Sequence, residues 1–391
     1  MEGNIAWVLI STALVLFMTP GLAFFYGGMV RSKNFLAMLM QNFFAIGLLA
    51  VIWTVVGYSL AFGSAGDGGW IGNLDFLGMK DVGLGDGTVL PPILFATFQM
   101  TFAIITPALI TGATADRLKF AGYAVLIGVW SILVYSPVAH WAFAGGLVVH
   151  INAGAAAIAV LLVIGARKGH GKEPMPPHAL PWTLMGTGIL WFGWFGFNAG
   201  SALAADGIAA QALFNTLVAP AAAMLGWLIV EKVKGKHVTT LGAASGAVAG
   251  MVAITPCAGF VGSMAAVIIG FAAGIICYLA LFIKEAAKLD DALDVIAVHL
   301  VGGIFGSVAL GLFADASING IVEHEGLFLG GGADLLIDQI VASVAVFAFS
   351  LIVTYIIAKA IDATMGLRVD EETEQVGLDQ VLHAETAYNN L

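Results

Sequence analysis

The chain has 391 residues, of which 60% are hydrophobic and only 10% are charged. A soluble domain is about 45–50% apolar and about 25% charged, so this composition excludes a soluble globular fold and predicts a polytopic membrane protein. The excess of 25 acidic over 15 basic residues argues against nucleic acid as a partner. Two cysteines, Cys257 and Cys277, are too few for a disulfide scaffold.

The apolar stretches of the chain predict its membrane spans. A membrane helix needs about 20 mostly apolar residues to cross a hydrocarbon core about 30 Å thick. The stretches without Asp, Glu, Lys or Arg are 5–30, 34–66, 90–115, 120–166, 174–205, 207–230, 237–283, 295–314 and 339–358. Two of them are long enough to cross twice. We expect their turns near Ser136-Pro137 and near Thr255–Gly259, where proline or glycine interrupts a helix. The total is eleven spans in an all-α protein.

The basic residues test this count, because the cytoplasmic loops of membrane proteins are enriched in Lys and Arg. Fourteen of the 15 lie in the gaps after odd-numbered spans, and only Lys80 lies on the other side. We therefore place the N-terminus outside the cell and the C-terminus in the cytoplasm of a multi-pass protein of the cell (plasma) membrane. The first span lacks a basic segment and a small-residue cleavage site, so we expect it to be retained.

Two units follow from the spans. Residues 1–362 form a transmembrane domain, and residues 363–391 form a cytoplasmic tail. The tail is rich in acidic residues, too polar to enter the bilayer, and compatible with disorder by composition. The Gly- and Asp-rich loops 63–89 and 315–334 are expected outside the cell.

Two histidines are the deepest ionisable residues of the spans. His150 lies in span five and His299 in span ten, and no Asp, Glu, Lys or Arg lies well away from an interface. An ionisable side chain inside the membrane is costly and is a functional candidate by default. The alternative is a neutral histidine that bonds to a backbone carbonyl or hydroxyl.

The position of these histidines suggests an inverted repeat. Spans 1–5 and 6–10 form two halves with an odd number of helices each, and a final helix follows. An odd number gives the halves opposite orientations, with a substrate path at their interface. Each histidine lies in the last helix of its half, so a two-fold axis would bring both together near the middle of the membrane.

Aromatic residues form a second pattern. Span three carries Phe98 and Phe102, and span six carries Trp191, Trp194 and Phe197. Aromatic rings attract cations, whereas ordinary packing and an interfacial belt are the alternative explanation. We find no metal-ligand spacing, Walker loop or hydrolase motif, so we expect neither an enzyme nor a bound cofactor or metal.

Six segments of the chain are too particular for generic membrane packing. They are TFQMTFA (97–103), FAGGLVVHINA (143–153), WFGWFGFNAGSA (191–202), SGAVAGMVAITP (245–256), DVIAVHLVGGIFG (294–306) and GLRVDEETEQVGLDQVLHAETAY (366–388). Together they resemble the Amt/Mep/Rh ammonium transporter family, and most of all its bacterial and archaeal Amt proteins. The resemblance covers essentially the whole chain. It implies an eleven-helix homotrimer with one substrate path per subunit.

The resemblance also implies roles for single residues. His150 and His299 match the paired pore histidines of the family, and Phe102 and Phe197 match its stacked phenylalanine gate. The remaining matches are Phe98 and Trp194 along the path, Ser201 as a hydroxyl that contacts the cation in the outer vestibule, and Asp294 as a structural acid near the cytoplasmic start of span ten.

One segment departs from the family pattern. Between spans four and five the chain runs directly through 139–144, without the family's Trp- and Gly-rich external segment. Ala142 stands where the family has an Asp, and Trp141 is the candidate replacement for the vestibule tryptophan. We therefore expect weaker recruitment of the cation.

The resemblance implies transport of ammonium, with methylammonium as an analogue. A bare cation in an apolar pore loses its hydration at high cost. The expected path therefore recruits ammonium outside and conducts ammonia, with or without the proton, past two imidazoles. Imidazoles can accept and donate a proton without a fixed charge.

Other functions fit the sequence less well. A symporter would need a buried carboxylate, a water channel would need paired Asn-Pro-Ala turns, and a hydrolase would need a nucleophile and a base. An ammonium-binding sensor or a transport-impaired variant stays open as the alternative, because the 139–144 segment is short. The family also implies a cytoplasmic partner, a trimeric PII-type signalling protein.

Overall fold

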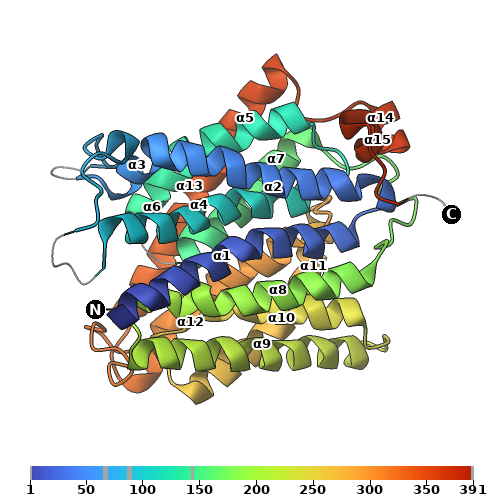
Figure 1. The fold of residues 1–391 in the computed structure, drawn as a ribbon. Coiled ribbons are helices and arrows are strands. Elements are labelled where there is room, and N and C mark those ends of the chain that lie inside the picture. The colour runs from blue at the N-terminus through green and yellow to red at the C-terminus, as the bar shows by residue number, and fades with distance from the viewer. Residues whose placement is uncertain (1, 65–68, 86–89, 142–144, 389–391) are drawn as a thin grey trace.

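The computed structural model describes residues 2–64, 69–85, 90–141 and 145–388, and these residues form helices and no strand. The long helices are α1 (Glu2–Met29), α2 (Phe35–Ile52), α4 (Pro92–Thr114), α5 (Phe120–Trp130), α7 (Asn152–Ile164), α8 (Leu180–Asn198), α9 (Gly207–Val233), α10 (Thr240–Ile254), α11 (Ser263–Ala286), α12 (Gly302–Phe313) and α13 (Asp334–Thr364). The short ones are α3 (Tyr58–Phe62), α6 (Ser136–Trp141), α14 (Glu371–Val376) and α15 (Leu378–His383). The bundle carries the N-terminus at one end and the C-terminus at the other (Figure 1).

Nine helical segments of the described residues are long and apolar enough to cross a membrane. They coincide with the expected spans except for 174–205 and the first half of 237–283, which form α8 and α10. Thr, Gly and Asn lower the hydropathy of α8, and α10 has 15 residues and is about 22 Å long. Both helices nevertheless pack along the long ones, α8 against α1 and α10 against α9 (Figure 1).

Of the two expected turns inside long stretches, one is wrong and one is confirmed. The helix from Phe120 to Trp141 continues through Ser136-Pro137. Its backbone tolerates proline because a π-helical turn at Ser131–Tyr135 precedes it and the Ser136 hydroxyl donates to the Ser131 carbonyl at 3.0 Å. The second turn lies where the sequence predicts it, between the end of α10 and the start of α11.

Four π-helical turns interrupt the long helices, at Trp53–Gly57, Ser131–Tyr135, Gly146–Ile151 and Ile296–Val301. Such turns are rare and are frequent at functional sites. The last two lead directly into α7 and α12, and each contains one of the two histidines of the spans. The sequence pattern gave no indication of them.

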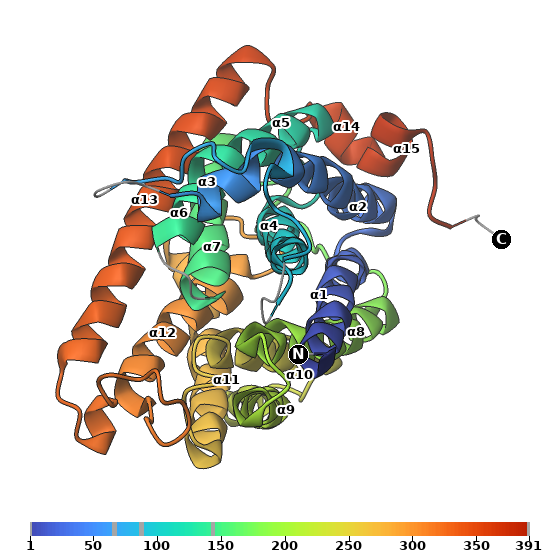
Figure 2. The same cartoon turned by 60° about the vertical axis from the view of Figure 1, so that its left-hand side comes forward.

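Glycine allows the helices of the bundle to approach closely. A Cβ atom at Gly186 in α8 would lie 2.2 Å from the backbone nitrogen of Phe25 in α1. A Cβ atom at Gly274 in α11 would lie 2.0 Å from the carbonyl oxygen of Ala223 in α9. Only glycine fits at these distances, as is common in the interfaces of membrane helices. The last long helix, α13, packs across α5, α7 and α12 on the outside of the bundle (Figure 2).

Ion pairs connect the loops at the C-terminal end of the bundle. Arg167, which follows α7, contacts Asp116 at 3.3 Å and Asp290 at 2.8 Å. Arg31, which follows α1, also contacts Asp116, at 3.0 Å. Loops from four different gaps of the predicted topology therefore meet on one side, where the Lys and Arg pattern placed them.

The described part of the tail is folded, although its composition is compatible with disorder. The Asp379 carboxylate accepts hydrogen bonds from the backbone N–H groups of Leu36 at 3.0 Å and Ala37 at 2.8 Å. An acidic side chain at the N-terminus of a helix, here α2, is stabilising. Val369 and Leu378 bury their side chains against Ala37. The composition of the tail does not predict this contact, because the complementary surface belongs to α2.

The neighbouring acids Asp290 and Asp291 have opposite shifts in pKa. Burial alone would raise the pKa of Asp290, but hydrogen bonds from Arg167 and the charges of Arg117 and Arg167 outweigh it and lower the pKa to about 2. Burial, followed by the charge of Asp294, raises the pKa of Asp291 to about 6.

These shifts predict opposite effects of two matched substitutions. Ionised Asp290 stabilises the fold above its unfolded pKa of about 3.9, and this contribution is lost as the pH falls toward 2. Asp290→Asn is therefore expected to lower the apparent melting temperature at pH 7. The contribution of protonated Asp291 is complete below about pH 4 and is lost as the pH rises through 6. Asp291→Asn is expected to raise the melting temperature at pH 7 and to flatten its dependence on pH.

Intrinsic tryptophan fluorescence of the detergent-solubilised variants during heating, at several pH values, checks both expectations. A similar loss of stability in the two variants at pH 7 would contradict the opposite shifts.

Candidate functional site

Two π-helical turns bring His150 and His299 into contact. Their Nδ1 atoms lie 3.2 Å apart, and their rings are nearly parallel at 14°. The exposed fraction of each side chain is 2% or less. One Nδ1 atom must carry the hydrogen while the other accepts it. The structure thus joins two histidines that lie 149 positions apart in the sequence.

A reciprocal contact between helices holds the pair. Each histidine is followed four residues later by a glycine, Gly154 or Gly303. A Cβ atom at Gly154 would lie 2.5 Å from the Cβ atom of Leu300, the residue after His299. A Cβ atom at Gly303 would lie 3.0 Å from the Cβ atom of His150. Each π-helical turn therefore rests against the glycine that follows the other.

The two ends of the histidine pair differ. The Nε2 atom of His299 lies 3.4 Å from the hydroxyl of Tyr26, which is also 3.3 Å from the carbonyl oxygen of Leu109. The Nε2 atom of His150 has no hydrogen-bond partner among the described residues. A cavity of about 10 Å³ with a mostly apolar lining lies beside the pair, which is room for about one water molecule.

Aromatic rings lie between the pair and a second, larger cavity. Phe102 and Phe197 meet at a centroid distance of 4.7 Å, and Phe98 lies 4.9 Å beyond Phe102. The two gate rings are inclined at 75° and so are edge-to-face, not stacked as the resemblance implies. The electrostatics of aromatic rings favours this arrangement. Trp194 and Phe197 in turn stack on His150, at 5.6 and 6.0 Å.

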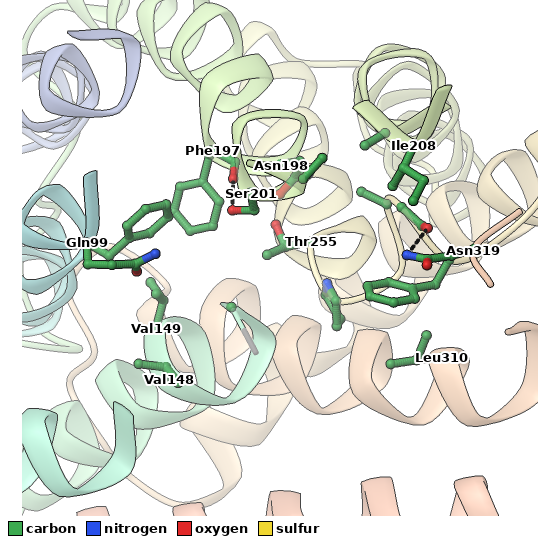
Figure 3. Close-up of a pocket in the computed structure, with 18 of the residues that line it drawn as sticks. Gln99, Val148, Val149, Phe197, Asn198, Ser201, Ile208, Thr255, Leu310 and Asn319 are labelled. Carbon is green, nitrogen blue, oxygen red and sulfur yellow. Dashed lines mark hydrogen bonds between the residues drawn. The ribbon is translucent and has the colours of Figure 1, made fainter. Parts of the chain in front are cut away.

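An outer cavity of about 480 Å³ leads to this gate (Figure 3). Ser201, which lines it, donates its hydroxyl hydrogen to the Phe197 carbonyl at 2.7 Å, so both lone pairs of its oxygen remain available. Gln99 also lines the cavity; its side chain is 8% exposed and has no hydrogen-bond partner in the described part of the chain. Thr255 accepts a hydrogen bond from the Trp194 indole at 2.8 Å.

Trp141 lies apart from this cavity. Its indole N–H donates to the Trp70 carbonyl at 2.5 Å, and its ring packs on Phe349 of α13 at 4.5 Å. It is not among the residues that line the cavity, and its expected role as the vestibule tryptophan stays a prediction. The helix that passes through Ser136-Pro137 carries Trp141 toward α13. Ala142 lies outside the described residues.

Asp294 forms an ion pair with Lys284 at the cytoplasmic start of span ten. The acid that caps the π-helical turn is Asp291, whose carboxylate accepts the backbone N–H of Ile296 at 2.7 Å. The sequence reasoning selected Asp294 and missed Asp291. The adjacent acids Asp290 and Asp291, which come shortly before an apolar span, were the sequence signal that could have identified Asp291.

Other features of the site were also missed. Tyr26 and Gln99 are single polar residues in apolar spans and carry no periodic signal, whereas the repeated spacing of a histidine and a glycine in both halves was readable. Among the described residues, no group of three or more His, Cys, Asp or Glu side chains could hold a metal ion. The site can therefore exchange protons and bind a small polar molecule through neutral groups.

The chain is similar to known ammonium transporters. Residues 6–388 match the model of the Ammonium Transporter Family. The chain is 45% identical to an ammonium transporter of Mycobacterium tuberculosis, over 99% of the chain and 90% of that protein. It is 44% identical to ammonium transporter Amt1 of Archaeoglobus fulgidus, over 99% of each.

Solved structures agree with these relatives. Mep2 of Saccharomyces cerevisiae superimposes with a TM-score of 0.87 at 33% identity, covering 95% of the chain and 91% of Mep2. A structure described as a sensor Amt protein superimposes with a TM-score of 0.90 at 29% identity, covering 98% of each chain.

The glycine contacts predict a graded series of substitutions. Gly154→Ala is expected to destabilise the protein by about 1–3 kcal/mol, because its Cβ would overlap the backbone and side chain of Leu300. Gly303→Ala, whose Cβ would lie 3.0 Å from the nearest atom, is expected to destabilise the protein less. Gly188→Ala in α8 is the matched control, since no atom lies within 4 Å, and is expected to be neutral or slightly stabilising.

Melting temperatures of the three purified variants test the order. Equal melting temperatures of Gly154→Ala and Gly188→Ala would show that the packing of Gly154 against Leu300 does not depend on close contact.

Proposed function

The chain belongs to the ammonium transporter family, and we propose that it moves ammonium or ammonia across the cell membrane along a path past His150 and His299. The observation that carries the proposal is the contact of these buried imidazoles at 3.2 Å behind an aromatic gate. Methylammonium is the expected analogue. The chemistry is transport, and no covalent step is required.

The path begins in the outer cavity, where a cation is recruited by neutral oxygen atoms. The free lone pairs of Ser201 and the amide oxygen of Gln99 are hydrogen-bond acceptors for ammonium. In the proposed orientation, the outer side carries eleven acidic residues and the single base Lys80, and hence the whole formal net charge of −10. A negative surface of this kind raises the local concentration of cations.

Ammonium cannot pass the gate at Phe102 and Phe197 as a hydrated ion. A bare cation in an apolar site is strongly unfavourable, so the proton is expected to leave the nitrogen there. Nε2 of His150, which has no hydrogen-bond partner among the described residues, is the proposed acceptor. Neutral ammonia then continues beside the histidines.

The hydrogen bonds around the pair allow two proton arrangements. When Tyr26 donates to the Leu109 carbonyl, His299 can donate from Nε2 to the Tyr26 oxygen and accept at Nδ1 from His150. His150 then presents a bare Nε2, which is basic. When Tyr26 donates to His299 instead, its bond to the Leu109 carbonyl is lost, the two hydrogen bonds of His299 reverse, and His150 carries a hydrogen on Nε2. A proton that enters at one end can thus leave at the other.

We also propose eleven crossings, an inverted repeat of spans 1–5 and 6–10, and the N-terminus outside. The packing of α8 and α10 along the long helices supports the count, and the reciprocal glycine contacts at the histidines support the repeat. A homotrimer with one path per subunit and a PII-type partner at the cytoplasmic loops complete the proposal; light scattering and a pull-down with such a partner test them.

A sensor is the second candidate function. The superposition on a sensor Amt protein with a TM-score of 0.90 favours it, together with the short external 139–144 segment. The described part of the tail contains two short helices, α14 and α15. Binding of ammonium without uptake into proteoliposomes would support the sensor and contradict the transporter.

The histidine pair is tested by uptake of methylammonium into proteoliposomes with simultaneous recording of current. Because proton transfer typically contributes about 100-fold or more, His150→Ala and His299→Ala are each expected to lower uptake by about this factor. His140→Ala is the matched control, because His140 bonds to the Ala61 carbonyl outside the path. Ordinary uptake in both pore variants, with unchanged selectivity, would rule out the assigned role.

Cysteine labelling tests the orientation in intact cells. The two native cysteines are buried, so background labelling is low. An impermeant maleimide is expected to reach Leu84→Cys and Glu323→Cys from outside. It is expected to reach Lys172→Cys and Glu372→Cys only after the cells are opened. Reversed accessibility of either pair would contradict the topology.

A further inference from the structure

The outer cavity is far larger than the cargo of the proposed function requires. It encloses about 480 Å³, whereas a molecule of the size of water takes up about 30 Å³ of liquid volume. Pockets that bind organic molecules have volumes of about 300–1,000 Å³. The surplus space is therefore sufficient for an organic ligand.

The cavity has two different ends (Figure 3). Gln99 and Phe197 lie at the end of the gate, and Ile208, Leu310 and Asn319 lie at the far end, with Ser201 and Thr255 between them. Apolar side chains from separate elements dominate the far end. Ile208 of α9 and Leu310 of α12 lie there (Figure 3), and Ala212, one turn after Ile208, and Ile321, two residues after Asn319, also line the cavity. We refer to these four residues as the far lobe.

The lining also restricts the charge of a ligand. The described residues that line the cavity include no Asp, Glu, Lys, Arg or His. A carboxylate would find no base here, which disfavours amino acids. An ammonium group, in contrast, finds oxygen acceptors in Ser201 and Gln99 and aromatic faces in Phe102 and Phe197. Gln99 as a residue is 8% exposed, and its amide lacks a protein partner in the described chain.

We propose that the outer cavity is a binding site for linear primary alkylammonium ions of about three to six carbons, a chain that a lobe of this size can bury. The ammonium group binds at Ser201 and Gln99, and the alkyl chain lies in the far lobe. These ions block the path and are not carried, because Phe102 and Phe197 are in contact and the cavity behind them holds only about 10 Å³. The inference rests on the proposed function in one respect only: the path is taken to run from the outer cavity through the gate to the histidines.

Burial of a chain in an apolar lobe makes affinity depend on its length. Each buried methylene is expected to tighten binding about fourfold. The dissociation constant should therefore fall about fourfold per carbon from propylammonium to hexylammonium. Butyrate, which has a chain of similar length but the opposite charge, is expected not to bind.

The experiment measures binding directly and inhibition separately. Titration calorimetry on the purified full chain in detergent gives the dissociation constants of propyl-, butyl- and hexylammonium. The same ions are then added from outside to proteoliposomes that take up radiolabelled methylammonium, and their own uptake is measured with labelled butylammonium. We expect competitive inhibition in the same order as binding, and no uptake of butylammonium.

Variants of the far lobe separate this site from non-specific partition into detergent or lipid. Ile208→Ser removes a partly buried apolar side chain from the lobe and is expected to reduce the gain per carbon. Ala212→Leu fills the lobe and is expected to weaken hexylammonium more than propylammonium. Leu329→Ser is the matched control, because Leu329 is an exposed apolar residue of the loop after α12 and lies outside the cavity lining. It is expected to behave as the unmodified protein.

The outcomes are distinct. Affinity without dependence on chain length, a dependence that persists in Ile208→Ser and Ala212→Leu, or uptake of butylammonium would each overturn the proposal. Should the far-lobe variants fail to fold, the chain-length series and the butyrate control on the unmodified protein still decide it. Length-dependent binding without any methylammonium uptake would uphold the site and contradict the proposed function. Methylammonium uptake without length-dependent binding would contradict the site and uphold the proposed function.

Discussion

The contact between two π-helical turns at His150 and His299 is the constraint on which the centre of this structure depends. The imidazoles meet at 3.2 Å because the glycines that follow them leave no side chain between the turns. Trp194 and Phe197 stack on His150, and the Trp194 indole is itself fixed by its hydrogen bond to Thr255. The aromatic gate, the histidine pair and the C-terminal end of α10 are therefore one packed unit.

The distribution of charge follows from the bilayer. Fixed charges inside the spans would be unfavourable, and the described path is lined by neutral groups and two titratable imidazoles. The ion pairs are concentrated in loops, where Arg167 joins Asp116 and Asp290. These pairs fix the loops between helices at one end of the bundle.

The tail and the outer cavity mark the two ends of the molecule. At one end, Asp379 caps α2 and holds the tail against the loops. At the other, the cavity before the gate is wide and partly apolar, and Trp141 is directed to α13 instead of the cavity. The cavity wall therefore offers a cation neutral oxygens and aromatic rings.

The sequence by itself determined the class of protein, the positions of most helices, the side on which the Lys and Arg loops gather, and the identity of the histidine pair and the gate. These follow from hydropathy, charge and family motifs, which are properties of single residues and short segments. Only the tertiary structure decided that the chain passes through Ser136-Pro137 as a helix and that the tail folds on α2. It alone placed Trp141 outside the cavity and Asp291 at the cap. Such features depend on π-helical turns and on contacts between segments far apart in the chain, where the hydrogen-bond partner or the complementary surface comes from elsewhere.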